Sequence, residues 1–263
     1  MDLQLRGRTA FVTGSTQGIG RAIAETLLAE GAAVVVSGRD GTRVRAVVED
    51  LRAAVPDADV SGIAADLADP AQVQRLLAEL GDVDVLVSCA GVFGLAAFAE
   101  VSDAEWQHYV EVNLMGGVRL SRHLLPRMLE RGWGRVVFVG TESAVDVPAD
   151  MVPYGATKAA ALALANGLAK LTRGTEVTVN TVLGGPTWSD GVAAAVAEVA
   201  RSQGAPVEAV RDAVVAGNPT SLLQRFIDPA EIAHLVAYLA SPLSSATNGA
   251  ALRADGGVLT TVL

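Results

Sequence analysis

The stretch "TAFVTGSTQGIGRAIAETLLAEGAAVVVSG", residues 9–38, decides the fold. It begins and ends with short valine-rich runs that are typical of buried strands. Between them, apolar residues recur at helical spacing, among them Ile19, Ile23 and Leu27, and Gly31 provides a stop. A strand, a glycine-rich turn, a helix and a second strand in this order predict a right-handed unit with two parallel strands.

The same alternation continues along the chain. Further apolar runs, each closed by glycine or polar residues, predict strands at residues 60–66, 83–91, 134–140, 176–182 and 249–255. Strands separated by helical patterns favour the α/β class. We expect a Rossmann-type, doubly wound parallel sheet with helices on both faces.

The composition indicates one domain. Of the 263 residues, 51% are hydrophobic but 4% are aromatic, so alanine, valine and leucine must build the core. No linker or repeat divides the chain, and we expect a single domain over residues 1–263. Residues 187–218 lack a strand pattern, and we expect them to form helices that cover a substrate cleft.

The net charge and the first residues of the chain limit the partners and the cellular location that we expect. The formal net charge of −9 argues against nucleic acid or a membrane surface as a partner. The first residues, "MDLQLRGR", lack the apolar stretch of a secretory signal. The single cysteine, Cys89, fits a reducing compartment, so we expect a cytoplasmic protein. His108, His123 and His234 lack metal-ligand spacing, and we expect no metal site.

The turn "TGSTQGIG", residues 13–20, lies where the first strand ends and the helix begins. Glycines there let the backbone approach a pyrophosphate, whose charge is favoured by the helix N-terminus. The spacing differs from the usual Gly-x-Gly-x-x-Gly fingerprint, so a purely structural turn is the alternative. A nucleotide site at this turn would use Gly14, Ser15, Thr16, Gln17, Gly18, Ile19 and Gly20.

The second strand ends in Ser37, Gly38 and Arg39. An acidic residue at this point would suit the ribose hydroxyl of NAD, whereas an arginine suits the 2′-phosphate of NADP. Ser37 and Arg39 can bind that phosphate, so we predict NADP(H) in preference to NAD(H), with NAD(H) still possible. The alternative is that Arg39 is a solvated loop residue.

Lys158 follows Tyr154 by four positions, shortly after Pro153. If Pro153 begins a helix, both side chains project from one face. A nearby ammonium would lower the pKa of the phenol and make Tyr154 a usable proton donor to a carbonyl. The alternative is a chance pair on a helix.

Taken together, these motifs resemble the short-chain dehydrogenase/reductase family over nearly the whole chain. The resemblance is carried by Thr13, Gly14, Gly18, Gly20, Asp66, Ala90, Gly91, Asn113, Tyr154, Lys158, the run "VTVN" ending at Asn180, and "DGG" at residues 255–257. It implies that Tyr154 is the general acid or base and that Lys158 holds the nicotinamide ribose. Asn113 would help hold a water that relays protons to Lys158.

The resemblance also implies further cofactor contacts. Asp66, followed by Leu67, would contact the adenine, with a helix cap as the alternative role for Asp66. The other expected contacts are Ala90, Gly91, Pro186 and Thr187. The pair Gly184 and Gly185 before Pro186 predicts a flexible loop beside the nicotinamide.

The family normally has a serine about 13 residues before the tyrosine, and here that position is Thr141. Its hydroxyl can still polarise a carbonyl, although the extra methyl group restricts its direction. Ser143 is the alternative. A second departure is Ser88 in place of an asparagine, followed by Cys89, which we expect to be a packing residue.

We therefore expect hydride transfer between NADP(H) and a carbonyl or secondary alcohol, with 3-oxoacyl thioesters among the candidate substrates. The alternative is a non-catalytic nicotinamide-nucleotide sensor or scaffold. The helix after Tyr154 is apolar on all sides between Ala159 and Ala165, so a second subunit should cover one face. We expect a homotetramer or a homodimer.

Overall fold

The computed structural model describes residues 2–262, which form one parallel sheet of seven strands. The strand order is β3-β2-β1-β4-β5-β6-β7. Every predicted strand is present, so the predicted fold class is confirmed. The strands are β1 (Thr9–Val12), β2 (Ala33–Gly38), β3 (Val60–Ala64), β4 (Val85–Ser88), β5 (Trp133–Thr141), β6 (Glu176–Gly184) and β7 (Ala251–Ala254).

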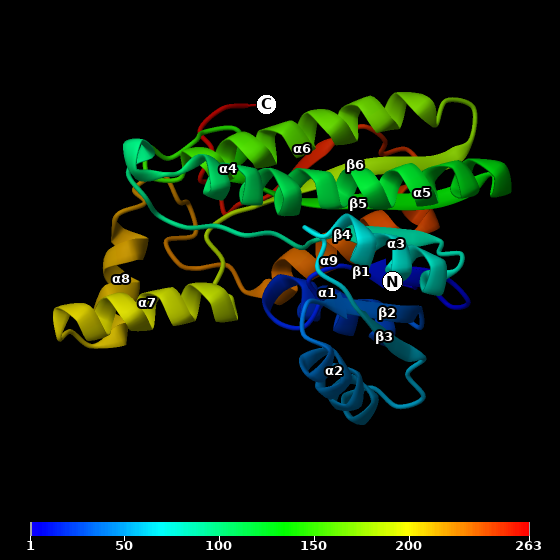
Figure 1. Ribbon diagram of the computed structural model, residues 1–263, viewed down its shortest axis with the longest axis horizontal. Coiled ribbons are helices and arrows are strands. Elements are labelled where there is room, and N and C mark those ends of the chain that lie inside the picture. Colours follow the sequence, from blue (N-terminus) through cyan, green and yellow to red (C-terminus); the bar gives the residue numbers. More distant parts are fainter. Residues whose placement is uncertain (1, 263) are drawn as a thin grey trace.

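Nine α-helices within residues 2–262 cover and flank the sheet. They are α1 (Gly18–Ala29), α2 (Gly41–Ala54), α3 (Pro70–Leu80), α4 (Asp103–Val110), α5 (Gly116–Arg131), α6 (Val152–Leu171), α7 (Asp190–Gln203), α8 (Val207–Ala216) and α9 (Pro229–Ala240). A π-helical turn, Glu111–Met115, joins α4 to α5. Helices α1, α2 and α9 lie on one face of the sheet and α3, α5 and α6 on the other (Figure 1).

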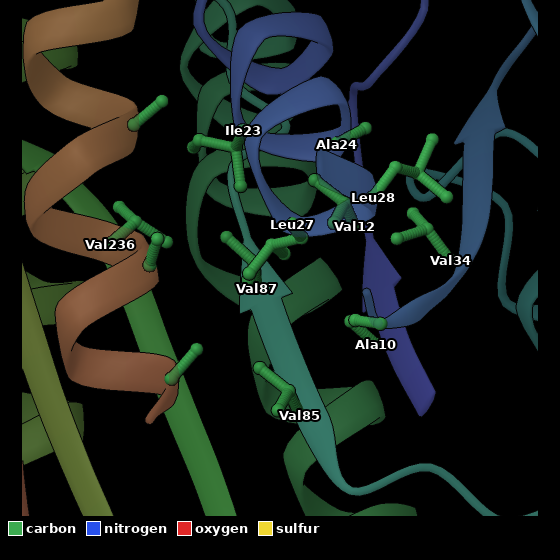
Figure 2. Packing of buried hydrophobic residues seen from close by; sticks show 14 of the residues in the cluster. Ala10, Val12, Ile23, Ala24, Leu27, Leu28, Val34, Val85, Val87 and Val236 are labelled. Atoms are coloured by element: carbon green, nitrogen blue, oxygen red, sulfur yellow. The ribbon is translucent and has the colours of Figure 1, made fainter. Parts of the chain in front are cut away.

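Both faces of the central strands are buried, which explains their continuous apolar runs. In β1, the side chains of Ala10 and Val12 belong to the apolar cluster on the face covered by α1, whereas Phe11 belongs to the cluster on the face covered by α5. Figure 2 shows the first of these layers, in which Leu27 of α1 packs beside Val87 of β4. All five of these side chains are fully buried. The alternation fixes the register, because a slip of one residue would exchange the two faces.

The order of the strands reverses between β1 and β4, which are neighbours although two strands separate them in sequence. In open α/β sheets, ligands bind outside the carboxyl ends of the strands at such a switch point. The glycine-rich turn follows β1, and Ala90 and Gly91 follow β4. The fold therefore gathers the predicted site residues at one edge.

The segment that we expected to be helical, residues 187–218, contains α7 and α8. These two helices pack on each other through a small cluster formed by Val196, Ala200 and Val210. Figure 1 shows this α7–α8 hairpin projecting from one end of the molecule, away from the layers that flank the sheet. Its packing is thus largely separate from the main core.

Residues 2–262 contain neither a membrane-spanning helix nor a cluster of metal-ligating side chains. No described helix combines the length and apolar character needed to cross a bilayer. The described histidine, cysteine and acidic side chains form no group of three that could hold a metal ion.

Candidate active site

The glycine-rich turn joins β1 to α1 and approaches the end of β4. Gly14 has a φ of +64°, and a Cβ there would lie 2.8 Å from the Cα of Ala90. Gly18 has a φ of +56°, and Gly20 packs against the backbone of Gly14 without room for a side chain. Left-handed backbone and close approach therefore both require glycine. The cradle that results at the N-terminus of α1 fits a diphosphate group.

The hydroxyl groups of the turn hold its shape. Thr13 Oγ1 accepts hydrogen bonds from the N–H groups of Cys89 and Ala90, each at 3.0 Å, and so ties β1 to β4. Ser15 Oγ donates to a carbonyl of β1 at 2.7 Å and accepts from the N–H of Ser37 at 2.9 Å. The side chain of Ser15, predicted to contact the cofactor, is therefore turned inward.

A carboxylate from α7 lies at the same cradle. Asp190 Oδ2 accepts a hydrogen bond from the N–H of Gly18 at 2.6 Å. The helix N-terminus that attracts an anion thus already faces one. The two residues are 172 positions apart, and no local pattern in the sequence connects them.

Two arginines, one directly after β2 and one in α2, lie near the turn. Arg39 is exposed, and Thr16 packs against the backbone beside it. Arg43 Nη2 donates to Gln17 Oε1 at 3.2 Å, which places a second guanidinium group next to the turn. The sequence analysis missed Arg43 because it lies on α2, beyond the end of the strand motif.

Asp66 lies in the turn between β3 and α3. Its Oδ1 accepts from the N–H of Ala68 at 2.9 Å. The N-cap of α3 is Asp69, so the alternative role of Asp66 as a helix cap is wrong. Leu67 is buried and packs against α5, which leaves only its backbone for a ligand.

Asn113 lies in the π-helical turn between α4 and α5. Its Oδ1 accepts from the N–H of Val92 at 2.8 Å, and its Nδ2 donates to Val92 O at 3.0 Å and to Thr157 Oγ1 at 3.1 Å. A Cβ on Gly91 would lie 3.2 Å from Lys158 Nζ and 3.3 Å from Asn113 Oδ1. The two predicted side chains therefore converge at Gly91.

A cavity of about 10 Å³ lies beside Lys158 and Asn113. Ser88 and Thr181 also line it, and Thr181 Oγ1 is buried without a hydrogen-bond partner among the described residues. A polar cavity of this size has room for one water molecule. It lies where a water that links Asn113 to Lys158 would be expected.

Tyr154 and Lys158 lie one turn apart on α6, whose first turn contains Pro153 as expected. Lys158 Nζ is buried and donates to Val139 O of β5 at 2.9 Å. Burial lowers the pKa of this amine. The lysine is thus held by the sheet edge.

The pKa of Tyr154 is raised in this structure, chiefly by burial and further by Glu142 and Cys89, while Thr141 partly offsets the rise. We expected Lys158 to lower that pKa, and for this structure the expectation is wrong. Desolvation of the phenol outweighs the amine, whose own charged form is disfavoured by burial. Tyr154 consequently holds its proton more tightly than a free phenol does.

Thr141 is the last residue of β5, and Glu142 and Ser143 follow it directly. Thr141 Oγ1 is 2.6 Å from Glu142 Oε2 and accepts from the N–H of Ser143 at 3.2 Å. Ser143 Oγ is 3.4 Å from Glu142 Oε1. Since Thr141 interacts with the phenol of Tyr154, it is the hydroxyl nearer to the expected reaction centre. The sequence analysis did not single out Glu142.

The loop after β6 makes hydrogen bonds to β7 and to the segment before α9. Gly185 donates from its N–H to Ala254 O at 3.1 Å and packs too closely against β7 for any side chain. Thr187 is buried, and its hydroxyl donates to Gly185 O at 2.8 Å. The N–H of Ile227 donates to Pro186 O at 2.8 Å. Gly185 thus serves close packing, and the flexibility of this loop stays a prediction.

Trp188 marks the start of the hairpin. Its ring packs on Phe226 with a centroid distance of 5.1 Å. Both rings line a cavity of about 660 Å³, together with residues of α8 such as Arg211. This cavity lies beyond the loop after β6 and contains none of the residues predicted to be catalytic.

The side chains of Tyr154, Thr141 and Lys158 form a compact arrangement at the carboxyl edge of β4 and β5. It contains a protonated phenol, a neighbouring hydroxyl, a buried amine and a polar cavity. A phenol and a hydroxyl that face one point can donate two hydrogen bonds to a single oxygen atom. Such an arrangement can polarise a carbonyl group and protonate the oxygen that results from hydride addition.

Comparison with protein families gave one match. Residues 8–200 fit the model described as short chain dehydrogenase. Among characterised and catalogued sequences, the chain is 43% identical to the uncharacterized oxidoreductase YvaG of Bacillus subtilis strain 168, and the match covers 100% of both chains. It is 29% identical to the 3-oxoacyl-(acyl-carrier-protein) reductase FabG of Aquifex aeolicus, over 98% of this chain and 100% of that protein.

Comparison with solved structures also matched a reductase. The L-sorbose reductase of Gluconobacter frateurii, determined in complex with NADPH and L-sorbose, matches with a TM-score of 0.94 and 30% identity. The match covers 100% of both chains.

Proposed function

This chain belongs to the short-chain dehydrogenase/reductase family of oxidoreductases, and we propose that it reduces a carbonyl substrate with NADPH. The observation that carries the proposal is the convergence of Tyr154, Thr141, Lys158 and Asn113 beside the glycine-rich turn. When bound, the nicotinamide would supply the hydride. The protein would supply orientation, hydrogen bonds to the carbonyl oxygen and one proton.

The proton would come from Tyr154, whose phenol is protonated at neutral pH. Thr141 would donate a second hydrogen bond to the same oxygen. Lys158 and Asn113, with the cavity between them, would return a proton to the phenol through water. In the oxidative direction the same groups would act in reverse.

The cofactor preference is supported by cations at the end of β2. Arg39 and Arg43 lie beside Thr16 and Gln17, where a 2′-phosphate would be neutralised. The solved relative was complexed with NADPH. We therefore propose NADP(H) as the preferred cofactor, to be tested by comparing kcat/KM for NADPH and NADH. A preference for NADH would refute this assignment.

The substrate class that we propose is a ketone, with 3-oxoacyl thioesters among the candidates. Relatives are named as reductases of 3-oxoacyl thioesters and of L-sorbose, which share a ketone group. The test is NADPH oxidation against a panel of 3-oxoacyl thioesters, ketoses and simple ketones. Tight NADPH binding without oxidation by any member would instead support a non-catalytic sensor.

We also infer a homo-oligomer, a tetramer or a dimer. The outer side of α6 exposes a row of small residues, Ala156, Ala160, Ala163 and Gly167. Such a row allows close approach of a second helix. Light scattering at micromolar concentration tests this, and an Ala163→Arg variant should give a smaller species. A wild-type monomer would contradict it.

A further inference from the structure

Glu142 is a half-buried carboxyl group at the reaction centre to which the proposed reaction gives no role. Its two oxygens lie 2.6 Å from Thr141 Oγ1 and 3.4 Å from Ser143 Oγ. It is also close enough to Tyr154 to affect the pKa of the phenol. A polar group placed so near to the reacting oxygen must influence the hydrogen bonds that reach it.

The surroundings of Glu142 favour the neutral acid. The titratable group beside it is Tyr154 of α6, and the other groups that affect the pKa of that phenol are Cys89 after β4 and Tyr109 of α4. Among residues 2–262, no lysine or arginine forms an ion pair with it. Burial raises its pKa, although the hydroxyl groups of Thr141 and Ser143 partly offset the rise.

The hydroxyl of Thr141 can donate only one hydrogen bond, because it carries one proton. A threonine hydroxyl has one proton to donate and two lone pairs that accept. One lone pair of Thr141 accepts from the N–H of Ser143. The 2.6 Å contact with Glu142 requires one proton between the two oxygens. If the threonine supplies that proton, none is left for a substrate carbonyl.

We propose that Glu142 is a positioning residue whose carboxylic acid donates to Thr141 Oγ1 and thereby leaves the threonine proton for the substrate carbonyl oxygen. This role rests on the proposed reductase function. Glu142 would keep its proton throughout the reaction, and Tyr154 would still provide the proton that the product gains.

Ionisation of Glu142 would reverse the hydrogen bond. The carboxylate can only accept, so Thr141 would donate to it and the carbonyl would keep Tyr154 as its one donor. Reduction should therefore be fast while Glu142 is protonated and slow after it ionises. Because its pKa is raised, the fall should occur above the pH at which an exposed glutamate ionises.

The pH dependence of kcat/KM for NADPH-linked reduction tests this role. In the wild type, kcat/KM should fall about tenfold per pH unit above the pKa of Glu142, until about 10²-fold is lost, as expected for one missing donor. In Glu142→Gln the amide can donate to Thr141 at every pH, so this alkaline fall should disappear. The matched control is Asp146→Asn, an exposed carboxylate of the same loop, which should keep the wild-type fall.

The same alkaline fall in Glu142→Gln as in the wild type would overturn the proposal. Carbon NMR of glutamate labelled at its carboxyl carbon gives a second readout that does not depend on turnover. The resonance lost in Glu142→Gln should titrate at the midpoint of the rate profile, and ordinary glutamate behaviour would also overturn the proposal. A wild-type protein that reduces no carbonyl would refute the reductase function itself, and this role with it.

Discussion

The carboxyl edge of the sheet and the α7–α8 hairpin are built in different ways. At the sheet edge, Val87 and Leu27 are fully buried, and glycines are required by close backbone contacts. In the hairpin, Val210 is the buried residue of α8, and the packing rests on one small cluster. The edge therefore holds the reacting groups rigidly, whereas the hairpin can adapt to a substrate without disturbing them.

The largest effect should come from the rigid edge. Tyr154→Phe removes the proton donor, so kcat should fall about 10³-fold while NADPH binding stays close to that of the wild type. Stopped-flow or steady-state NADPH oxidation measures kcat, and fluorescence titration measures the affinity for NADPH. Retained turnover would show that another group donates the proton.

A matched pair of valine truncations compares the two regions in stability. Val87→Ala should lower the free energy of unfolding by about 2 kcal/mol, because two methyl groups leave a packed core. Val196→Ala should lower it by less than about 1 kcal/mol, because the hairpin can open without the sheet. Urea denaturation measures both. Equal losses would show that the hairpin is part of the same cooperative unit.

The third prediction compares the binding of NADPH and NADH at the carboxyl edge of the sheet. Arg39→Ala should raise the Kd for NADPH about tenfold, because one charge-assisted contact with the 2′-phosphate is lost at an exposed position. The Kd for NADH should change little, and Arg43→Ala should give a similar pattern. Calorimetric titration measures all four values. Equal weakening of both cofactors would mean that these arginines act on structure and not on the phosphate.

The smallest effect should arise where the two regions meet. Asp190→Asn removes a negative charge from the N-terminus of α1, so NADPH should bind about threefold more tightly. Glu198→Gln changes an exposed carboxylate of α7, the helix that also carries Asp190, and should have no effect on NADPH binding. Weaker binding in Asp190→Asn would show that the carboxylate helps to hold the cofactor.

The sequence was informative where local pattern and local geometry coincide. The apolar runs predicted every strand, and the glycines of the turn were found in the conformations and contacts that need them. Asn180, part of a motif in the sequence, is explained by its hydrogen bonds to Thr247 O and to the N–H of Ala250.

The sequence was less informative where contacts join distant segments. Asp190 reaches Gly18, and Arg43 reaches Gln17, through folding that no local pattern encodes. The pKa of Tyr154 was predicted in the wrong direction because spacing on a helix does not reveal burial. The hydrogen bond between Gly185 and Ala254 was also missed, because β7 is encoded far along the chain.

The contact between Asp190 and Gly18 has a consequence for the sequence of binding events. A diphosphate at the N-terminus of α1 must take over the N–H group that the carboxylate now holds, so the side chain of Asp190 must move away from Gly18. The hairpin would then settle over the dinucleotide and complete the pocket for the second reactant. We therefore expect compulsory-order kinetics, in which the dinucleotide adds first and leaves last.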